Sequence, residues 1–273
     1  MSSPVRKLTP VAQSDAKPMV AIDNVTMAFG SFTAVQDVNL TVGDGEFLSI
    51  VGPTGCGKST ILNAIAGLLK PAKGSVSIDG AAVNGVQNNI GYLFQQDALL
   101  PWKTAYQNVE LGLMFRGMPE AERRGKVMAW LEKVGLKGFE SRFPHMLSGG
   151  QRKRVQMAQA LITEPKVILM DEPFSALDIH TRHLMQNELL RLWQEDRRAV
   201  VMITHDLEEA IALGDRVVVL AAGPKSRVIE SFPVDLERPR NVAEIKLDPK
   251  FMTLYRDIWA SLRGEVEKSY ARH

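Results

Sequence analysis

The chain of 273 residues is long enough for one large domain or two small ones with a sizeable core. Hydrophobic residues make up 45% and charged residues 23%, and the formal net charge of +2 argues against a dedicated nucleic-acid-binding protein. A single cysteine, Cys56, excludes an intrachain disulfide, and no apolar stretch approaches the roughly 20 residues that a membrane span requires.

The N-terminal third of the sequence reads as strands around one glycine-rich loop. Residues 1–18 are polar and lack the apolar core of a signal peptide, so we expect a disordered leader and no export by the usual route. Alternating apolar positions predict strands over Val20–Phe29 and Ala34–Val42, with a turn near Gly30-Ser31. Phe47–Val51 is a short apolar strand that runs into the loop. Helical periodicity follows over Lys58–Leu69, with Ile61, Leu62, Ile65 and Leu68 on one face.

The rest of the chain alternates between strand and helix patterns. Short strands are predicted at Ser75–Ile78 and Ile90–Leu93, and a helical insertion is expected over about residues 97–162. Its helices are predicted at Tyr106–Phe115, Pro119–Val134 and Gly150–Ile162. Later strands are predicted at Val167–Met170, Ala199–Ile203, Arg216–Ala221 and Arg227–Ser231. Helices are predicted at Thr181–Glu195 (capped by Asp178 or Thr181), at Asp206–Leu213 and near Pro249–Glu267. The pattern predicts an α/β core with a helical insertion and a short tail.

The loop after Phe47–Val51 matches the phosphate-binding pattern G-x-x-x-x-G-K-[ST] in full. Its residues are Gly52, Pro53, Thr54, Gly55, Cys56, Gly57, Lys58, Ser59 and Thr60. Glycines let backbone N–H groups converge on phosphates, and the next helix presents its positive N-terminus to them. Lys58 can reach the outer phosphates, and the Ser59 hydroxyl can bind Mg²⁺. The alternative is a glycine-rich turn before an ordinary helix, which the preceding strand disfavours.

Two acids close the apolar run Val167–Met170. Asp171 and Glu172 are expected at the carboxyl end of a buried strand, where open α/β sheets bind ligands. Asp171 suits Mg²⁺, through water, and Glu172 suits a base that orients or deprotonates the attacking water. Taken alone the pattern also fits a helix N-cap, and it gains weight from the phosphate loop upstream.

The phosphate loop, the two acids and four further segments, all in the order that the family has, resemble the ATP-binding-cassette (ABC) ATPases over residues 20–231. Gln95 stands where the family has its Q-loop glutamine, and Leu147-Ser148-Gly149-Gly150-Gln151 matches the family signature. Ser175-Ala176-Leu177-Asp178 looks like the D-loop, and His205 looks like the switch histidine. The resemblance implies a P-loop NTPase (RecA-like) core with an antiparallel β subdomain and an inserted α-helical subdomain. The ABC ATPase domain would span residues 19–231, followed by a tail at 232–273.

The resemblance also implies a role for each matching residue. Gln95 would touch Mg²⁺ or the attacking water and sense a transmembrane partner. His205 would hydrogen-bond the γ-phosphate and hold Glu172, although a lone histidine is often structural. Phe29 occupies the position of an aromatic residue that stacks on adenine. Tyrosine is commoner there, and a core residue is the alternative reading. ATP and Mg²⁺ are the implied cofactors, and Asp178 would contribute to the nucleotide site.

The signature predicts a second copy as partner. Ser148, Gly149 and Gly150 precede a helix that begins near Gln151, and they form a second anion-binding helix terminus in a chain that already has one. In the family this terminus covers the ATP held by another copy, so that two chains sandwich two nucleotides head to tail. The resemblance therefore implies a symmetric dimer that ATP closes and hydrolysis opens.

Two further expectations concern reactivity and contact. Cys56 lies near Lys58 and a helix N-terminus, both of which favour a thiolate, so we expect alkylation to inhibit and ATP to protect. The alternative is a small residue that merely fits. The apolar segment Leu99–Trp102 follows Gln95, where a permease would dock, and exposed apolar residues make good anchors. The alternative is that it packs inside the insertion.

The amino-acid sequence of several segments narrows the resemblance to one group within the family. Gln95–Thr104, Leu192-Trp193, Thr204–Ala210 and Arg238-Pro239-Arg240 look like the nitrate/sulfonate/taurine importer group. This implies the ATPase subunit of an importer for a small anion or organic solute. It would work with separate permease chains and, indirectly, an extracytoplasmic solute-binding protein, at the cytoplasmic face of the inner membrane. The alternatives are an ABC ATPase acting on nucleic acid or ribosomes, which predicts a basic face, and a silent binding protein, which predicts missing catalytic residues.

Overall fold

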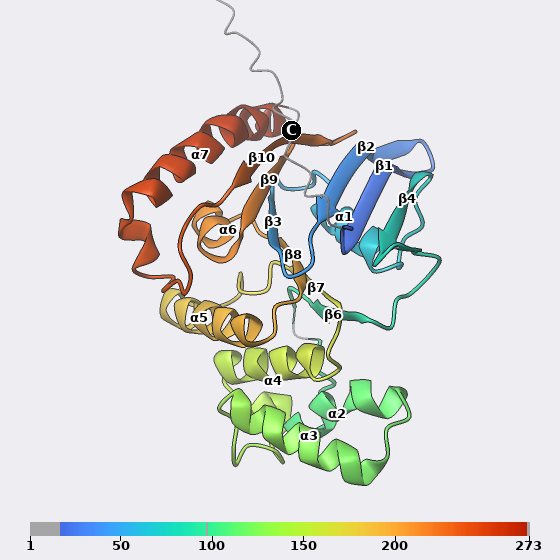
Figure 1. Cartoon of the computed structure of the whole chain (residues 1–273), viewed down its shortest axis with the longest axis vertical. Helices are drawn as coiled ribbons and strands as arrows, with labels where there is room; N and C mark the ends of the chain where they lie inside the picture. Colours follow the sequence, from blue (N-terminus) through green and yellow to red (C-terminus); the bar gives the residue numbers. More distant parts are fainter. Residues whose placement is uncertain (1–16, 97, 272–273) are drawn as a thin grey trace, which may run out of the picture.

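A computed structural model gives the fold and describes residues 17–96 and 98–271. All of the predicted leader except Lys17 and Pro18 lies outside the described residues. Two β-sheets carry helices against their faces, and a group of helices lies at one end of the molecule (Figure 1). The predicted α/β class is therefore confirmed.

The smaller sheet is antiparallel, with the strand order β2-β1-β4-β5. Its strands are β1 (Val20–Phe29), β2 (Phe32–Val42), β4 (Lys73–Ile78) and β5 (Ala81–Ala82). Val20 and Ile22 of β1 are buried, because successive side chains of a strand point to opposite faces and only one face meets the core. A register shift between Ile22 and Val25 moves the alternation by one residue, so that Val25 and Met27 are buried as well. The alternation in the sequence thus predicted β1 and β2, whereas the two-residue strand β5 was not predicted.

The larger sheet has the order β10-β9-β3-β8-β7-β6 and is parallel except for β10. Its strands are β3 (Phe47–Val51), β6 (Ile90–Leu93), β7 (Val167–Asp171), β8 (Ala199–Ile203), β9 (Arg216–Leu220) and β10 (Val228–Pro233). Every residue of β3 and β8 is buried, as expected of parallel strands covered on both faces. Because β3, β7 and β8 run parallel, the loops that follow them all lie at the carboxyl end of the sheet.

Helix α1 (Lys58–Ile65) is shorter than the predicted Lys58–Leu69. Gly67 has a φ of +73°, and a Cβ atom there would lie 1.8 Å from the carbonyl oxygen of Gly85. The chain therefore leaves the helix at a position that only glycine occupies without strain. As a result Leu68 lies outside the helix and is 51% exposed, and its predicted place on one helical face with Ile61, Leu62 and Ile65 is wrong. Ile61, Leu62 and Ile65 are buried in the core beside both sheets.

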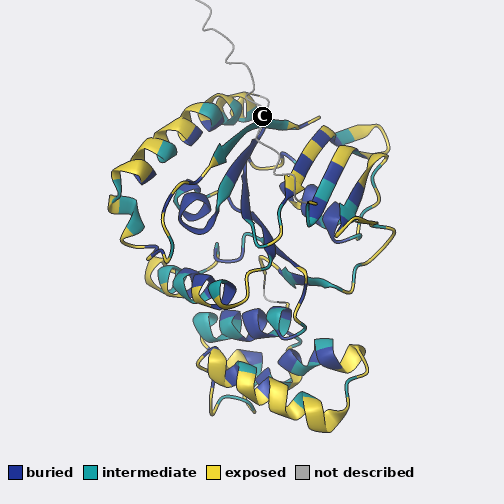
Figure 2. Ribbon diagram, in the orientation of Figure 1, coloured by how far each residue is buried: buried dark blue, intermediate teal, exposed yellow. Residues whose placement is uncertain are grey.

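Three helices between β6 and β7 form the group at the lower end of Figure 1. They are α2 (Ala105–Phe115), α3 (Glu120–Lys133) and α4 (Gly149–Leu161), with a short 3-10 helix at Pro144–Met146. Gly135 follows α3 with a φ of +70°, which explains why that helix stops. Figure 2 shows the outer side of α3 exposed, while Val127 and Leu131 on its other side are buried. The domain boundaries suggested by the sequence stay predictions.

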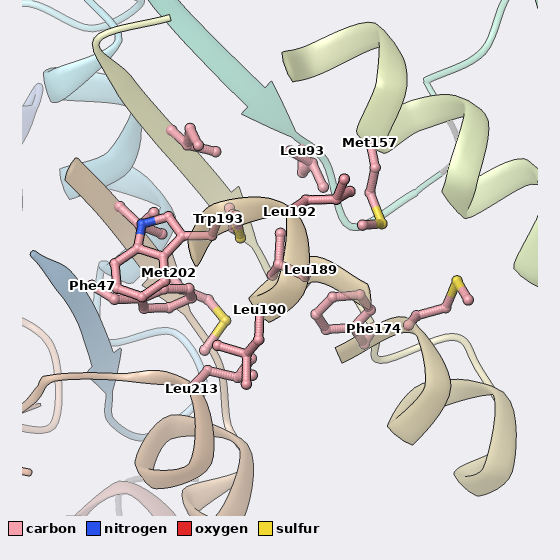
Figure 3. Packing of buried hydrophobic residues seen from close by; sticks show 14 of the residues in the cluster. Phe47, Leu93, Met157, Phe174, Leu189, Leu190, Leu192, Trp193, Met202 and Leu213 are labelled. Atoms are coloured by element: carbon pink, nitrogen blue, oxygen red, sulfur yellow. The ribbon is translucent and has the colours of Figure 1, made fainter. Parts of the chain in front are cut away.

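The remaining helices cover the other face of the larger sheet. They are α5 (Ile179–Glu195), α6 (Leu207–Leu213) and α7 (Pro249–Tyr270), with a 3-10 helix at Ile245–Leu247. Figure 3 shows Trp193 of α5 against Phe47 of β3. The ring centroids are 5.5 Å apart and the planes stand at 81°, a favourable edge-to-face contact. Within residues 17–96 and 98–271, no helix combines the length and the apolar character needed to cross a membrane.

Candidate functional site

The glycine-rich loop connects β3 to α1 and places Lys58 inside its own turn. Lys58 is buried, and its Nζ donates to the carbonyl oxygens of Gly52 at 2.8 Å and Pro53 at 3.0 Å. Gly57 has a φ of +94°, and a Cβ atom there would lie 2.5 Å from Cγ1 of Val35. The loop therefore needs glycine at this position, and its curled backbone has the form of an anion cradle at a helix N-terminus.

Ser59, in the first turn of α1, contacts Asp171 at the carboxyl end of β7. Ser59 Oγ donates to Asp171 Oδ1 at 3.2 Å, although 112 residues separate them in sequence. Burial raises the pKa of Asp171, and the negative charge of Glu172 adds to the rise, while the Ser59 hydrogen bond opposes it. A hydroxyl and a carboxylate are both hard oxygen donors of the kind that Mg²⁺ prefers. Two of the three residues predicted to contact Mg²⁺ therefore form a donor pair suited to that ion beside the phosphate loop.

Glu172 follows β7 and receives two side chains from other segments. His205 Nδ1 lies 3.0 Å from Glu172 Oε2, and Gln95 Nε2 donates to the same oxygen at 3.4 Å. Glu172 itself has a φ of +44°, which is unusual for a residue with a side chain. The structure thus brings together the three residues predicted as catalytic. Gln95 is found on the carboxylate of Glu172, and its predicted contact with Mg²⁺ stays a prediction.

The signature residues cap α4. Ser148 Oγ accepts from the backbone N–H of Gln151 at 3.2 Å, and Gln151 Oε1 accepts from the N–H of Ser148 at 2.9 Å. This reciprocal pair is a capping box, so the Gln151 side chain is engaged within the helix terminus itself. Gly149 and Gly150 form the first turn above it.

A cleft of about 560 Å³ joins the signature to the catalytic residues. It lies between the start of α4, the carboxyl ends of β7 and β8, and the segment that precedes α5. Its lining residues are Gln95, Gln96, Gly149, Arg152, Lys153, Glu172, Ser175, Ala176, Leu177 and His205. The cleft therefore contains the predicted Q-loop, signature, D-loop and switch positions, together with polar groups that can face water or a phosphate.

Asp178 and Phe29 occupy different surroundings. Asp178 caps α5 by accepting from the N–H groups of His180 and Thr181, and hydrogen bonding by Thr181 lowers the pKa of its carboxyl. Phe29 ends β1 and is 48% exposed, so the alternative reading of it as a core residue is wrong. Its predicted contact with adenine stays a prediction.

Two expectations need correction. Cys56 is fully buried, and burial raises the pKa of its thiol more than the nearby Lys58 charge lowers it. The expected thiolate is therefore wrong, because the side chain points into the core while the backbone forms the loop. The segment Leu99–Trp102 divides: Leu99 is buried in the core, whereas Trp102 is 70% exposed. The expectation that the whole segment forms an exposed apolar surface is therefore wrong, and Trp102 is the exposed aromatic residue of the segment.

The sequence did not indicate Arg182 or Phe32. Arg182, in the first turn of α5, donates to the Leu177 carbonyl at 3.0 Å and lies 3.8 Å from Asp206. It links the D-loop segment to the residue after His205, a contact that depends on how α5 and α6 face each other. Phe32 pairs with Phe29 across the hairpin and is 52% exposed. Two aromatic residues flanking the Gly30-Ser31 turn were the available signal for it.

Comparisons with known proteins agree on one family. The family profile described as "ABC transporter" matches residues 35–175. An uncharacterized ABC transporter ATP-binding protein of Methanocaldococcus jannaschii is 43% identical over 257 residues, covering 93% of this chain and 94% of the relative. The taurine import ATP-binding protein TauB of Escherichia coli K12 is 42% identical over 240 residues, covering 86% and 94%.

Solved structures give the same result. A dimeric ATP-binding cassette in a post-hydrolysis state, bound to ADP and phosphate, has a TM-score of 0.69 at 38% identity. The match covers 80% of this chain and all of that one. The cbiO1 protein of Clostridium perfringens, described as part of an ABC transporter complex, has a TM-score of 0.73 at 26% identity. It covers 91% of this chain and 97% of that one.

Proposed function

Because this chain belongs to the ABC transporter family of ATP-binding proteins, we propose that it is the ATPase subunit of an importer. The predicted ABC ATPase fold and the ATP-binding, ATP-hydrolysing activity are confirmed by these relatives. The importer role rests on the similarity to TauB, whose name describes taurine import. We therefore propose that ATP hydrolysis here drives uptake of a small anion or organic solute of the nitrate, sulfonate or taurine type.

The arrangement around Glu172 is the observation that carries the proposed mechanism. The N–H groups of residues 52–60 and the Lys58 ammonium would bind the β- and γ-phosphates. Ser59 and Asp171 would hold Mg²⁺, which neutralises phosphate charge when bound. Glu172 would orient the attacking water and accept its proton, while His205 fixes the carboxylate from 3.0 Å and Gln95 from 3.4 Å. Phe29 would stack on the adenine ring.

The proposed working form is a head-to-tail dimer. Ser148, Gly149 and Gly150 lie at the N-terminus of α4, which would be a second anion-binding helix terminus besides that of α1, and Ser148 caps α4. In a symmetric pair this terminus and Asp178 would close over the nucleotide held by the phosphate loop of the partner. The dimeric cassette bound to ADP and phosphate supports this proposal. Closing and opening would move permease chains at the cytoplasmic face of the inner membrane, where exposed Trp102 is a candidate anchor.

Replacing Glu172 by glutamine tests the catalytic assignment. The amide keeps the shape of the side chain but cannot accept a proton, so we expect ATP turnover to fall at least about 100-fold. ATP binding should survive, and light scattering with ATP should show more dimer than in the wild type. The matched control is Glu267→Gln on the exposed side of α7, which should hydrolyse ATP normally. Full turnover in Glu172→Gln would refute the assigned role.

The transport assignment needs a separate observation. The genes beside this one should encode a permease and a solute-binding protein, and the three products should purify together. Reconstituted in vesicles, the assembly should hydrolyse ATP faster when the loaded binding protein is added. The ligand that this binding protein retains identifies the solute. Stimulation by RNA or ribosomes, with none by any permease, would instead place the ATPase outside transport.

A further inference from the structure

The segment between β9 and β10, residues 221–226, is fixed against the antiparallel sheet. Lys225 N–H donates to the Thr33 carbonyl at 2.9 Å, and Ser226 N–H donates to the Ala34 carbonyl at 3.1 Å. Ser226 is fully buried, and its Oγ donates to the Ala221 carbonyl at 2.8 Å. Below we call residues 221–226 the β9–β10 loop. Its position is set by β2, the strand that also packs against the phosphate loop through Val35.

The backbone of the β9–β10 loop lies directly under the phosphate loop. A Cβ atom at Gly223 would be 3.0 Å from the Gly55 carbonyl oxygen and 3.4 Å from Cys56 Cα. At the end of β9, Leu220 is equally close to the other side: a Cβ atom at Gly52 would be 3.2 Å from both its Cβ and its carbonyl oxygen. The space between the two backbones is therefore too small for an added methyl group, and close packing of this kind is expected to couple the position of one loop to that of the other.

The tail helix α7 holds this loop through one side chain. Glu265 Oε2 accepts from the backbone N–H of Ala222 at 2.8 Å, and its carboxylate also pairs with Lys268. The Glu265 side chain is only 12% exposed. Burial would raise the pKa of Glu265, but the hydrogen bonds from Lys268 and Ala222 outweigh it, so the pKa is lowered and the carboxylate is charged at neutral pH. Phe251, Ile258 and Leu262 anchor the helix in the core, and Figure 1 shows it running along β10 and α6.

We propose that Glu265 is a positioning residue for nucleotide binding, which holds Ala222 and thereby keeps Gly223 pressed against the phosphate loop. The inference rests on the proposed role of residues 52–60 as the phosphate cradle. A cradle of N–H groups binds phosphate well only when its backbone is already in place, because ordering a loose loop costs free energy at the moment of binding. Loss of the Glu265 contact should therefore weaken ATP binding while leaving the chemistry at Glu172 unchanged.

The test compares ATP affinity and turnover in the full-length protein. Glu265→Ala should raise the KM and the Kd for ATP by about three- to tenfold, since one charge-assisted hydrogen bond is lost. The kcat should stay within about twofold, because no group at Glu172 changes. Glu265→Gln keeps an oxygen that can accept from Ala222 N–H, so it should restore most of the ATP affinity.

Two controls separate positioning from general loss of stability. Leu262→Ala loosens the same helix by removing a buried side chain without touching Ala222, and Glu267→Ala removes only an exposed pair with Arg263. Both should bind ATP like the wild type at a temperature where they are folded. Equal KM rises in Leu262→Ala and Glu265→Ala, or an unchanged KM in Glu265→Ala, would overturn the proposal. If Lys58→Ala binds ATP as tightly as the wild type, the phosphate-loop assignment itself fails, a result that is distinct from failure at Glu265.

Discussion

At Glu172 the chain holds a carboxylate on a backbone conformation that disfavours side chains. A φ of +44° costs on the order of 1 kcal/mol for a residue other than glycine. Three hydrogen bonds hold its backbone there: Glu172 N–H donates to the Ile203 carbonyl at 2.9 Å, and the Glu172 carbonyl accepts from Ser175 Oγ at 3.0 Å and from Ser175 N–H at 3.3 Å. The direction of the Glu172 carboxylate therefore depends on neighbouring residues. A substitution at Ser175 should change that direction while leaving the carboxylate itself in place.

Cys56 gives a prediction at the same scale. Its thiol is fully buried and burial raises its pKa, so little thiolate exists at neutral pH and the sulfur is inaccessible. We expect iodoacetamide to leave the folded protein unmodified at pH 7.5, with full ATPase activity and no effect of added ATP. Since Cys56 is the sole cysteine, mass spectrometry before and after unfolding in urea measures its modification directly. Rapid labelling of the folded protein with loss of activity would contradict this burial.

Among the elements, α6 depends on an arginine from the tail. Arg240 is buried, and its guanidinium donates to carbonyl oxygens at the end of α6, at 2.6 Å to Gly214 and 3.2 Å to Ile211. Burial lowers the pKa of Arg240 to about 10, which still leaves it charged at neutral pH. Carbonyls at a helix C-terminus have no intrahelical donor, so Arg240 provides their hydrogen bonds. Its positive charge also interacts favourably with the negative end of the helix dipole. The same helix begins at Leu207, two residues after His205.

Arg240→Ala should lower the free energy of unfolding by about 2–4 kcal/mol, because several buried carbonyls lose their donor. Arg240→Lys should lose most of the same amount, since one ammonium cannot span the carbonyls that the planar fork reaches. Urea denaturation at equal slope measures both changes. The control Arg263→Ala removes an exposed i,i+4 pair and should change stability by less than about 0.5 kcal/mol. If Arg240→Ala also changed the free energy of unfolding by less than about 0.5 kcal/mol, water would be replacing the guanidinium as donor to these carbonyls.

Local pattern sufficed for most elements but not for contacts between distant segments. The strand Phe47–Val51 was predicted to its exact ends because it is a short run, apolar except for Ser49, bounded by Glu46 and the glycine loop. The end of α1 was missed because the apolar periodicity continues to Leu68, whereas Gly67 has a φ of +73° and lies so close to the Gly85 carbonyl, a neighbour only in space, that a side chain would not fit. Cys56 was misread for the same reason: sequence shows its charged neighbours, whereas only the packed fold shows which way its side chain points.

For the whole molecule, the phosphate loop and the signature predict a site shared between two chains. Lys58→Ala and Ser148→Arg should each inactivate both sites of their own homodimer. In a mixed dimer one site carries both defects and the other carries none, as head-to-tail symmetry requires. Mixing the two proteins should therefore restore up to about a quarter of the wild-type sites. ATPase activity no higher than the sum of the two parents would mean that each nucleotide is bound by one chain alone.

The position of β3 has a consequence for the biosynthesis of the protein. This early strand carries the phosphate loop, yet both its neighbours in the sheet, β8 and β9, come about 150 residues later. At roughly 5–20 residues per second, a ribosome needs on the order of ten to thirty seconds to supply them. During that interval the apolar strand Phe47–Val51 emerges with no sheet partner, and it is a segment that chaperones of nascent chains would bind. The nucleotide site is therefore assembled late in translation, although its phosphate loop is among the first parts to be made.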